Sequence, residues 1–296
     1  MFGILNVNKP PGWTSRDALN RVEGLLRPLK AGHAGTLDPL ASGVLVVCVG
    51  AATRLLDFVQ QMPKVYVATF LLGRRSPSDD VETDAELMGD ARTPTREEIE
   101  AALPQFIGAI DQRPPAFSAV KVEGRRAYRL ARRGDVVELA PRPIEIYQLE
   151  ILQYEYPAIQ LKFQCGSGTY VRSLGRYLAA ALGTHAVMSA LVRTAIGGFR
   201  IEQAMDARGP DLDRLQRHLQ SPLAAIPHLP RLVLSPQQVF EVQHGGLIKV
   251  DDLPPNLQSS PADAIAAIDE REQLIALLKE VRPGWLKPCP NFLQPA

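Results

Sequence analysis

Residues 32–50 read GHAGTLDPLASGVLVVCVG and combine a glycine-rich segment with an unbroken apolar run. The stretch contains four glycines, and glycine loses the most backbone freedom on folding, so this density is typical of a shaped loop. The run VLVVCV has the length and composition of a buried strand. The sequence therefore predicts a loop that is anchored directly on a core strand.

Asp38 is the only carboxylate in residues 32–50. It precedes Pro39, and an Asp-Pro pair favours a turn in which the carboxylate caps its own loop. A chemical role needs instead an ionised carboxylate that faces a ligand. Both interpretations stay open from this stretch alone.

The composition of the chain is that of an ordinary globular protein. Its length of 296 residues predicts one large domain and a second small one. Its residues are 46% hydrophobic and 22% charged, which is ordinary for a soluble globular protein. The first residues lack the pattern of a secretory signal, and no apolar run approaches the length of a membrane span, so we expect a cytoplasmic protein without a membrane partner. The three cysteines are Cys48, Cys165 and Cys289, and their spacing predicts free thiols and no structural zinc.

The formal net charge of +1 conceals a segregation of charge along the chain. Residues 79–100 carry nine acids, whereas residues 113–133, which we call the basic segment, carry one acid and seven basic residues: Arg113, Lys121, Arg125, Arg126, Arg129, Arg132 and Arg133. Such a segment is able to neutralise phosphates, and an acidic surface turned away from RNA keeps a protein in solution. A solvated surface without a partner is the alternative. Helical spacing would place Arg125, Arg129 and Arg132 on one face.

Apolar periodicity predicts the main elements. Alternating or continuous apolar residues predict strands over 3–8, 64–72 and 159–165. Helical periodicity predicts helices after Thr14 and from Thr169, and the second of these carries Arg172 in its first turn. Residues 74–94 are polar and acidic, so we expect a surface excursion there, followed by a helix capped by Thr95.

The C-terminal part of the chain differs in composition. Four prolines mark residues 206–230 as a connecting segment: Pro210, Pro222, Pro227 and Pro230. We therefore expect two domains, 1–230 and 231–296. In the second domain, Ser235 begins a helix, Gly245-Gly246 ends it, and short apolar runs follow, of which QLIALLKEV fits a helix or a strand.

The stretch G-H-A-G-T-L-D-P-L-A-S-G-V-L resembles the catalytic motif of the bacterial tRNA pseudouridine-55 synthase family, TruB. Further segments resemble that family in the same order: 64–66, 113–121 and 168–174. The resemblance implies the pseudouridine synthase fold, an α/β (α+β) architecture with a mixed, largely antiparallel sheet flanked by helices, and a small C-terminal β-rich domain of the PUA type. One departure is clear, because the family commonly shows Thr-Asp-Thr after the glycine that matches Gly73, and this chain has RRSPSDD.

The resemblance also implies a substrate and site residues. The substrate would be uridine 55 in the T-arm loop of tRNA, with no metal or organic cofactor and no obligate protein partner. Asp38 would initiate the reaction, Tyr66 would stack on the flipped base and take the proton from C5, and Leu191 would line the uracil pocket. His33 would stack within the RNA loop as the base leaves. From the residues alone, Tyr66 and Leu191 also fit a core, and His33 fits a structural hydrogen-bonding role.

The chemistry agrees with these assignments. Breaking the bond between C1′ and N1 develops positive charge on the sugar, and a carboxylate can stabilise that charge, attack C1′ or remove the C2′ proton. A glycoside hydrolase normally uses two carboxylates, whereas the glycine-rich loop offers only Asp38, which favours isomerisation. The aspartate must stay ionised in a site closed to water, and we expect Arg172 to supply the opposing charge. A phosphate-binding role is the alternative for Arg172.

Two rival functions from other classes remain. A non-enzymatic RNA-binding or RNA-folding protein with this architecture would not need Asp38, and a glycosidase or glycosyltransferase acting on nucleosides would release free base. If the protein is the isomerase, we expect the basic segment to contact RNA phosphates, through Lys121, Arg125, Arg129 and Arg132.

Overall fold

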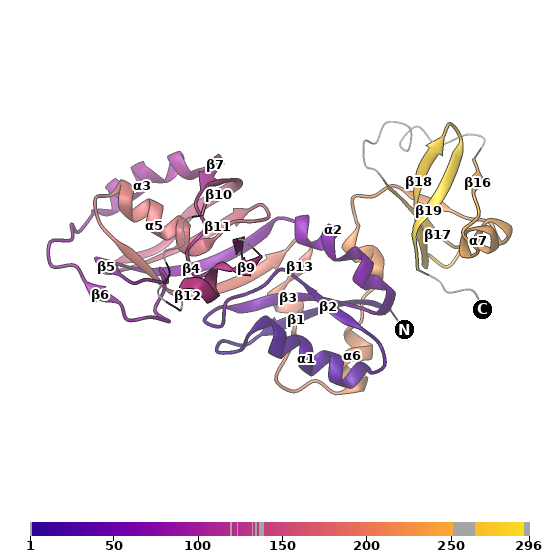
Figure 1. Ribbon diagram of the computed structural model, residues 1–296, viewed down its shortest axis with the longest axis horizontal. Helices are drawn as coiled ribbons and strands as arrows, with labels where there is room; N and C mark the ends of the chain where they lie inside the picture. Colours follow the sequence, from indigo (N-terminus) through magenta and orange to yellow (C-terminus); the bar gives the residue numbers. More distant parts are fainter. Residues whose placement is uncertain are drawn as a thin grey trace.

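A computed structural model describes residues 2–118, 120–122, 124–131, 133, 135, 139–250 and 264–292. The described strands form a ten-stranded mixed sheet flanked by helices and a five-stranded sheet near the C-terminus, which Figure 1 shows at one end of the molecule. The predicted α/β architecture, with a largely antiparallel main sheet and a β-rich C-terminal part, is confirmed.

The large sheet has the strand order β14-β1-β3-β12-β4-β11-β10-β7, with β13 paired to β12 and β2 paired to β3. Only the pairs β1–β14 and β3–β12 are parallel among its described ladders. Its strands are β1 (Gly3–Lys9), β2 (Ala31–Ala34), β3 (Ser42–Val49), β4 (Lys64–Leu72), β7 (Gly108–Gln112), β10 (Arg142–Glu155), β11 (Ala158–Cys165), β12 (Ala186–Ile196), β13 (Phe199–Arg200) and β14 (Met205–Asp206).

The helices and the smaller sheets complete the described fold. The α-helices are α1 (Ser15–Leu26), α2 (Leu56–Gln61), α3 (Arg96–Ala102), α4 (Ala127–Ala131), α5 (Val171–Ala181), α6 (Leu212–His218) and α7 (Pro236–Gln243). Two hairpins pair β5 (Arg74–Arg75) with β6 (Glu86–Leu87) and β8 (Lys121–Val122) with β9 (Arg125–Arg126). The five-stranded sheet contains β15 (Arg231–Val233), β16 (Ile248–Lys249), β17 (Ile265–Ile268), β18 (Leu274–Arg282) and β19 (Trp285–Asn291).

Helix α1 begins where its capping residues predict. The Thr14 hydroxyl accepts from the Asp17 amide at 3.1 Å, and the Asp17 carboxylate accepts from the Thr14 amide at 2.8 Å. This capping box satisfies two backbone donors that the first helical turn leaves without a partner. The helix then buries Ala18, Leu19 and Val22 in a core shared with β1 and β3.

The loop before β3 is shorter than its glycines suggest. Residues 32–34 belong to β2, which pairs with β3 so that Gly32 faces Cys48. A Cβ at Gly32 would lie 2.9 Å from the Leu56 side chain, so the glycine permits close packing of α2 rather than a turn. Gly43, with φ of +105°, lies so close to β12 that a Cβ would meet the Arg193 carbonyl at 2.2 Å. The shaped loop is therefore residues 35–41, between two strands of the sheet.

Strand β4 lies between β11 and β12, and α5 packs against β4 and β12. One face of β4, with Tyr66, Phe70 and Leu72, is buried in the same core as α5, whereas the residues of the other face are only half-buried. The helix approaches closely because Gly175 has no side chain: a Cβ there would lie 2.1 Å from Phe70 Cε1. This close contact fixes the start of α5, and therefore Arg172, relative to the sheet.

The prediction that residues 206–230 form an unpacked connection is wrong. Leu215 of α6 is buried in the core beside α1, and Leu223, Ile226 and Leu229 are buried in a second core. Prolines here bound short helices, since proline is tolerated in a first helical turn, as at Pro222. The same core also contains Ala266 and Phe292 from the C-terminal part of the chain.

The five-stranded sheet begins at Arg231, and we propose the boundary between domains 1–230 and 231–296 there. QLIALLKEV lies in strand β18, which resolves the choice that its pattern left open. Helix α7 starts after Ser235 with a capping box, as predicted. The cysteines are free thiols, as predicted, with Cys48 and Cys165 buried and Cys289 exposed.

Candidate active site

The loop that carries Asp38 is held on both sides of this residue by the buried polar side chains of Ser15 and Lys9. Ser15 Oγ accepts from the Leu37 amide at 2.8 Å and donates to the Leu37 carbonyl at 3.2 Å. Lys9 Nζ donates to the carbonyls of Trp13 at 2.6 Å and Pro39 at 3.5 Å, and burial lowers the pKa of Lys9 to about 8. The loop is thus bonded to the segment that joins β1 to α1.

The carboxylate of Asp38 does not cap its own loop. The Asp38 backbone carbonyl accepts from the Ala41 amide at 3.0 Å, while the Leu40 amide donates to Glu82 Oε1 at 3.0 Å. The Asp38 side chain instead lies 3.1 Å from Arg172, measured from Oδ2 to Nη2. This contact confirms the pairing that the sequence predicts and leaves the Asp38 side chain 36% exposed beside a nearly buried cation.

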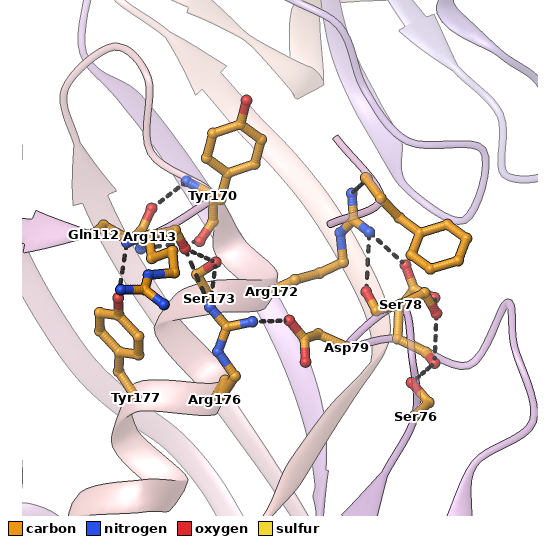
Figure 2. Close-up of polar contacts among 12 residues, drawn as sticks. Ser76, Ser78, Asp79, Gln112, Arg113, Tyr170, Arg172, Ser173, Arg176 and Tyr177 are labelled. Atoms are coloured by element: carbon orange, nitrogen blue, oxygen red, sulfur yellow. Dashed lines mark hydrogen bonds and ion pairs between the residues drawn. The ribbon is translucent and has the colours of Figure 1, made fainter. Parts of the chain in front are cut away.

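Arg172 lies in the first turn of α5 and is surrounded by oxygen acceptors (Figure 2). Besides Asp38, Nη1 contacts Asp80 Oδ2 at 3.3 Å, and the guanidinium donates to the carbonyls of Ser78 and Phe117, each at 3.0 Å. A cation near a helix N-terminus opposes the helix dipole, and here two carboxylates compensate for it. The Arg172 guanidinium is thus buried and surrounded by two carboxylates and two backbone carbonyls, Asp38 among them.

Asp80 brings a second carboxylate to the site, which sequence reasoning missed. It is 1% exposed, and its Oδ1 accepts from the Glu82 amide at 3.0 Å and contacts the Ser78 hydroxyl. The prediction of a purely surface excursion over residues 74–94 is wrong at this turn, because backbone bonds to Met188 hold it against β12. In the sequence, the small residues Ser76 and Ser78 alternate before Asp80, and this pattern was the available signal for a buried turn. The structure buries both serines.

The charges around Asp38 act in opposite directions. Burial raises the pKa of Asp38 above its ordinary value, the Arg172 guanidinium lowers it, and the Asp80 carboxylate raises it again. The net direction is upward. The Asp38 carboxylate therefore protonates at a higher pH than an exposed aspartate does as the pH falls.

Tyr66 and Leu191 belong to the same core as the loop that carries Asp38. Tyr66 is 8% exposed, stacks on Phe163 with ring centroids 5.4 Å apart, and shares a core cluster with Leu37 and Leu191. Burial raises the pKa of Tyr66, and the positive charge of Arg193 opposes that rise. Tyr66 and Leu191 are therefore core residues that lie near Asp38. A core position and a contact with the uracil base are compatible for both of them.

Arg193 is a buried cation that sequence reasoning missed. It is 1% exposed, and it donates through Nε to the Val44 carbonyl at 2.7 Å and through Nη2 to the Gly35 carbonyl at 3.1 Å. It thus joins β12 to both ends of the Asp38 loop. A single charge inside the apolar run of β12 was the signal for such a role.

His33 lies in β2 rather than in a loop, and it is half-buried. Its pKa is lowered mainly by burial and also by Arg193, so it is neutral at pH 7. Among the described residues, its Nδ1 is buried without a hydrogen-bond partner.

The basic segment is only partly helical. Arg125 and Arg126 form strand β9 after a turn at Gly124, which has φ of +80°, and α4 begins at Ala127. The predicted helical face from Arg125 through Arg129 is therefore wrong at its start, since a hairpin replaces the first turn. Arg125 is exposed, Arg132 lies outside the described residues, and so do the side chains of Lys121 and Arg129.

Among the described residues, no group of three or more histidine, cysteine, aspartate or glutamate side chains is arranged to hold a metal ion. Within the same part of the chain, no helix is both long enough and apolar enough to cross a membrane.

Comparison with known proteins decides the family. Residues 23–171 match the TruB family pseudouridylate synthase (N terminal domain). The chain belongs to this family. A tRNA pseudouridine synthase B from Rhodopirellula baltica is 41% identical over 259 residues, which cover 82% of this chain and 74% of that protein. One from Dehalococcoides mccartyi is 36% identical over 301 residues, which cover 100% of this chain and 98% of that protein.

A solved structure shares the fold of this TruB family member. The similar chain comes from a Cbf5-Nop10-Gar1 complex, with a TM-score of 0.72 and 26% identity over 99% of this chain and 85% of that one. The resemblance noted from the sequence is thereby confirmed, and the protein is a pseudouridylate synthase, an isomerase.

Proposed function

We propose that the protein isomerises uridine 55 in the T-arm loop of tRNA to pseudouridine, in the cytoplasm, and that Asp38 initiates glycosidic cleavage. The observation that carries this proposal is the pairing of Asp38 with Arg172 at 3.1 Å, in which the carboxylate is reachable from solvent and the guanidinium is not. Relatives named tRNA pseudouridine synthase B support tRNA as the substrate class.

The charge of the site suits cleavage of the glycosidic bond. One guanidinium lies between two carboxylates, so Asp38, Arg172 and Asp80 together carry a net charge of −1 when both acids are ionised. Positive charge that develops on the ribose is stabilised by such a cluster in a site of low dielectric. The target base lies within a folded loop, so it must be flipped out before Asp38 contacts its sugar.

Tyr66 would act after the base has turned. Its ring offers a stacking surface, and its hydroxyl, after losing its own proton to give the phenolate, would take the proton from C5. A buried phenol ionises reluctantly, and the neighbouring Arg193 guanidinium reduces this cost. Leu191 would pack against the uracil, and His33 would stack on the bases that remain in the RNA loop.

RNA would be held by two parts of the chain. Exposed cations of the basic segment would neutralise phosphates, with Arg125 the described example and Lys121, Arg129 and Arg132 completing the set. The five-stranded domain, which we propose to be of the PUA type, would supply a second RNA contact. No protein partner or cofactor is required by this scheme.

The proposal is tested by incubating the pure protein with a tRNA transcript and mapping its modified positions. We expect pseudouridine at position 55 and no free uracil. Release of uracil would favour a nucleoside glycosidase, and tight binding without modification would favour an RNA-binding or RNA-folding protein. A transcript with position 55 changed to cytidine is the matched control, and it should not be modified.

A further inference from the structure

Arg176 lies one helical turn after Arg172 on α5 and joins two separate segments of the chain (Figure 2). Its Nη1 pairs with the Asp79 carboxylate, and its Nη2 donates to the Arg113 carbonyl at 3.1 Å. Nη2 also lies 3.4 Å from Ser173 Oγ. The pair is partly shielded from water, since the Asp79 side chain is only 16% exposed.

The two segments that Arg176 joins are the ones that orient Arg172. The turn that contains Asp79 supplies the Ser78 carbonyl, and the segment that begins at Arg113 supplies the Phe117 carbonyl. A guanidinium is planar and rigid, so these two neutral acceptors determine where its remaining N–H groups point. A shift of either segment would therefore change how Arg172 faces Asp38.

Segment 113–118 is bonded at both of its ends, and at its last residue the Ser118 carbonyl accepts from the Tyr128 amide at 3.0 Å. Pro114 and Pro115 have no N–H to donate to a sheet ladder. The Arg113 amide donates to the Tyr177 hydroxyl at 2.8 Å, and Ser173 Oγ donates to the Arg113 carbonyl at 2.9 Å. The segment is thus anchored at its first residue by side chains of α5, and Arg176 is the charged member of that set.

The turn on the other side of Arg176 is strained. Asp79 has φ of +59°, a left-handed conformation that residues other than glycine adopt rarely. Its neighbours in sequence, Ser78 and Asp80, both contact Arg172. An ion pair at Asp79 therefore holds the turn in the conformation that presents both contacts.

We propose that Arg176, held by Asp79, is a positioning residue for pseudouridine formation: it fixes the 76–80 turn and segment 113–118 so that Arg172 keeps Asp38 oriented. This inference rests on the proposed function and extends it to a residue that touches neither substrate nor Asp38. It also connects the start of the basic segment to the catalytic aspartate through backbone contacts.

The test compares Arg176→Gln, Arg176→Lys and Asp79→Asn with the parental protein. Arg208→Gln is the matched control, because it removes another Arg–Asp pair, to Asp206, that is exposed. At saturating tRNA we expect Arg176→Gln and Asp79→Asn to lower kcat about tenfold to a hundredfold, as small misplacements do, with tRNA Kd changed about twofold or less. Arg176→Lys keeps the charge without the fork, so its kcat should lie between those of Arg176→Gln and the parent.

A pH profile separates positioning from general destabilisation. Two groups of charged or titratable side chains act electrostatically with the Asp38 carboxylate. The first group is Arg172 of α5 with Asp80 and Glu82 of the neighbouring turn, and the second is Lys9 and Tyr66. If Arg172 is displaced, its lowering of the Asp38 pKa weakens, so the acid limb of kcat in Arg176→Gln should move to higher pH. An unchanged limb with lowered kcat would contradict the proposal.

Hydrogen exchange keeps the inference separate from the proposed function. In Arg176→Gln, the amides of residues 116–118 and 78–80 should exchange faster than in the parent and in Arg208→Gln. If the parental protein forms no pseudouridine, the proposed function fails, and this exchange result alone decides whether Arg176 holds the two segments. Unchanged exchange, or an effect confined to tRNA Kd, would overturn the positioning role.

Discussion

The Asp38 carboxylate pairs with Arg172, which also contacts the Asp80 carboxylate, so burial and two opposite charges together set the pH at which Asp38 ionises. Its pKa is raised, chiefly by burial, above the ordinary value of 3.8. Because the proposed mechanism needs the ionised form of Asp38, activity should be lost as the pH falls through this raised pKa, and the acid limb of kcat/KM should lie above pH 3.8.

Changing Asp80 tests that balance directly. The Asp80 charge raises the pKa of Asp38, so Asp80→Asn should move the acid limb to lower pH while its plateau falls, because Arg172 loses a partner. Single-turnover rates measured against pH check both effects. Asp206→Asn, an exposed aspartate paired with Arg208, should leave the limb in place. A limb that moves upward in Asp80→Asn would contradict this electrostatic account.

The Tyr66 hydroxyl is expected to matter for proton transfer but not for folding. Tyr66→Phe keeps the ring stacked on Phe163 and removes the group that accepts the C5 proton, so pseudouridine formation should fall about a hundredfold or more. Tyr154→Phe is the control, since its hydroxyl donates to the Pro94 carbonyl outside the site. A parental rate in Tyr66→Phe would remove the tyrosine from the chemistry.

At this scale the sequence predicts the residues of local motifs better than their distant partners. Asp38 and Arg172 are predicted because each follows a recognisable glycine turn and the chemistry requires opposite charges. Asp80 and Arg193 are not, because their contacts depend on segments far apart in sequence. The Asp80–Arg172 and Arg193–Gly35 contacts arise only when β12 and α5 are placed against the loop.

Helix α5 positions Arg172 through its contact with β4, and Gly175 is the point of closest approach. In Gly175→Ala, the added Cβ would meet Phe70 Cε1 at 2.1 Å, so the helix or the ring must move. We expect a loss of about 1–3 kcal/mol in the free energy of unfolding, as in other overpacked cores, together with a lower kcat. Denaturant unfolding and turnover at saturating tRNA measure the two effects.

Gly24 provides the control for that substitution. It also lies in a helix, α1, but a Cβ there would meet nothing within 4 Å. Gly24→Ala should therefore stabilise the protein by roughly 0.5–1 kcal/mol, through helix propensity alone, with kcat unchanged. Equal destabilisation by both substitutions would show that the contact with Phe70 does not position α5.

Elements with capping residues and clear periodicity are predicted well from this sequence. Helices α1, α3 and α7 all start at the capping boxes of Thr14, Thr95 and Ser235. Strand β2 and helix α6 are not predicted, because glycines and prolines usually mark loops. Their structure is decided instead by backbone pairing with β3 and by burial of Leu215.

For the whole molecule, the basic segment should dominate the salt dependence of tRNA binding. Each phosphate contact releases counterions, so removing two contacts in Arg125→Gln/Arg133→Gln should flatten the log-log salt slope by about one to two units. These are exposed arginines of the segment. The control is Arg92→Gln/Arg96→Gln, which changes the net charge of the protein equally. These two arginines lie in the acidic stretch 79–100, where both pair with glutamates. Equal slopes for both double variants would show that net charge alone acts.

Asp38 starts the reaction in the proposed mechanism, and the substitution Asp38→Asn removes the charge that this step requires. The change keeps the size of the side chain, and Arg172 retains Asp80 as a partner, so the fold should survive. Asp57→Asn, at an exposed aspartate of α2, is the matched control. The measurement is pseudouridine formed per enzyme at saturating tRNA, alongside tRNA Kd. We predict no product above background for Asp38→Asn with Kd within about twofold of the parent; measurable turnover by the pure variant would contradict the account.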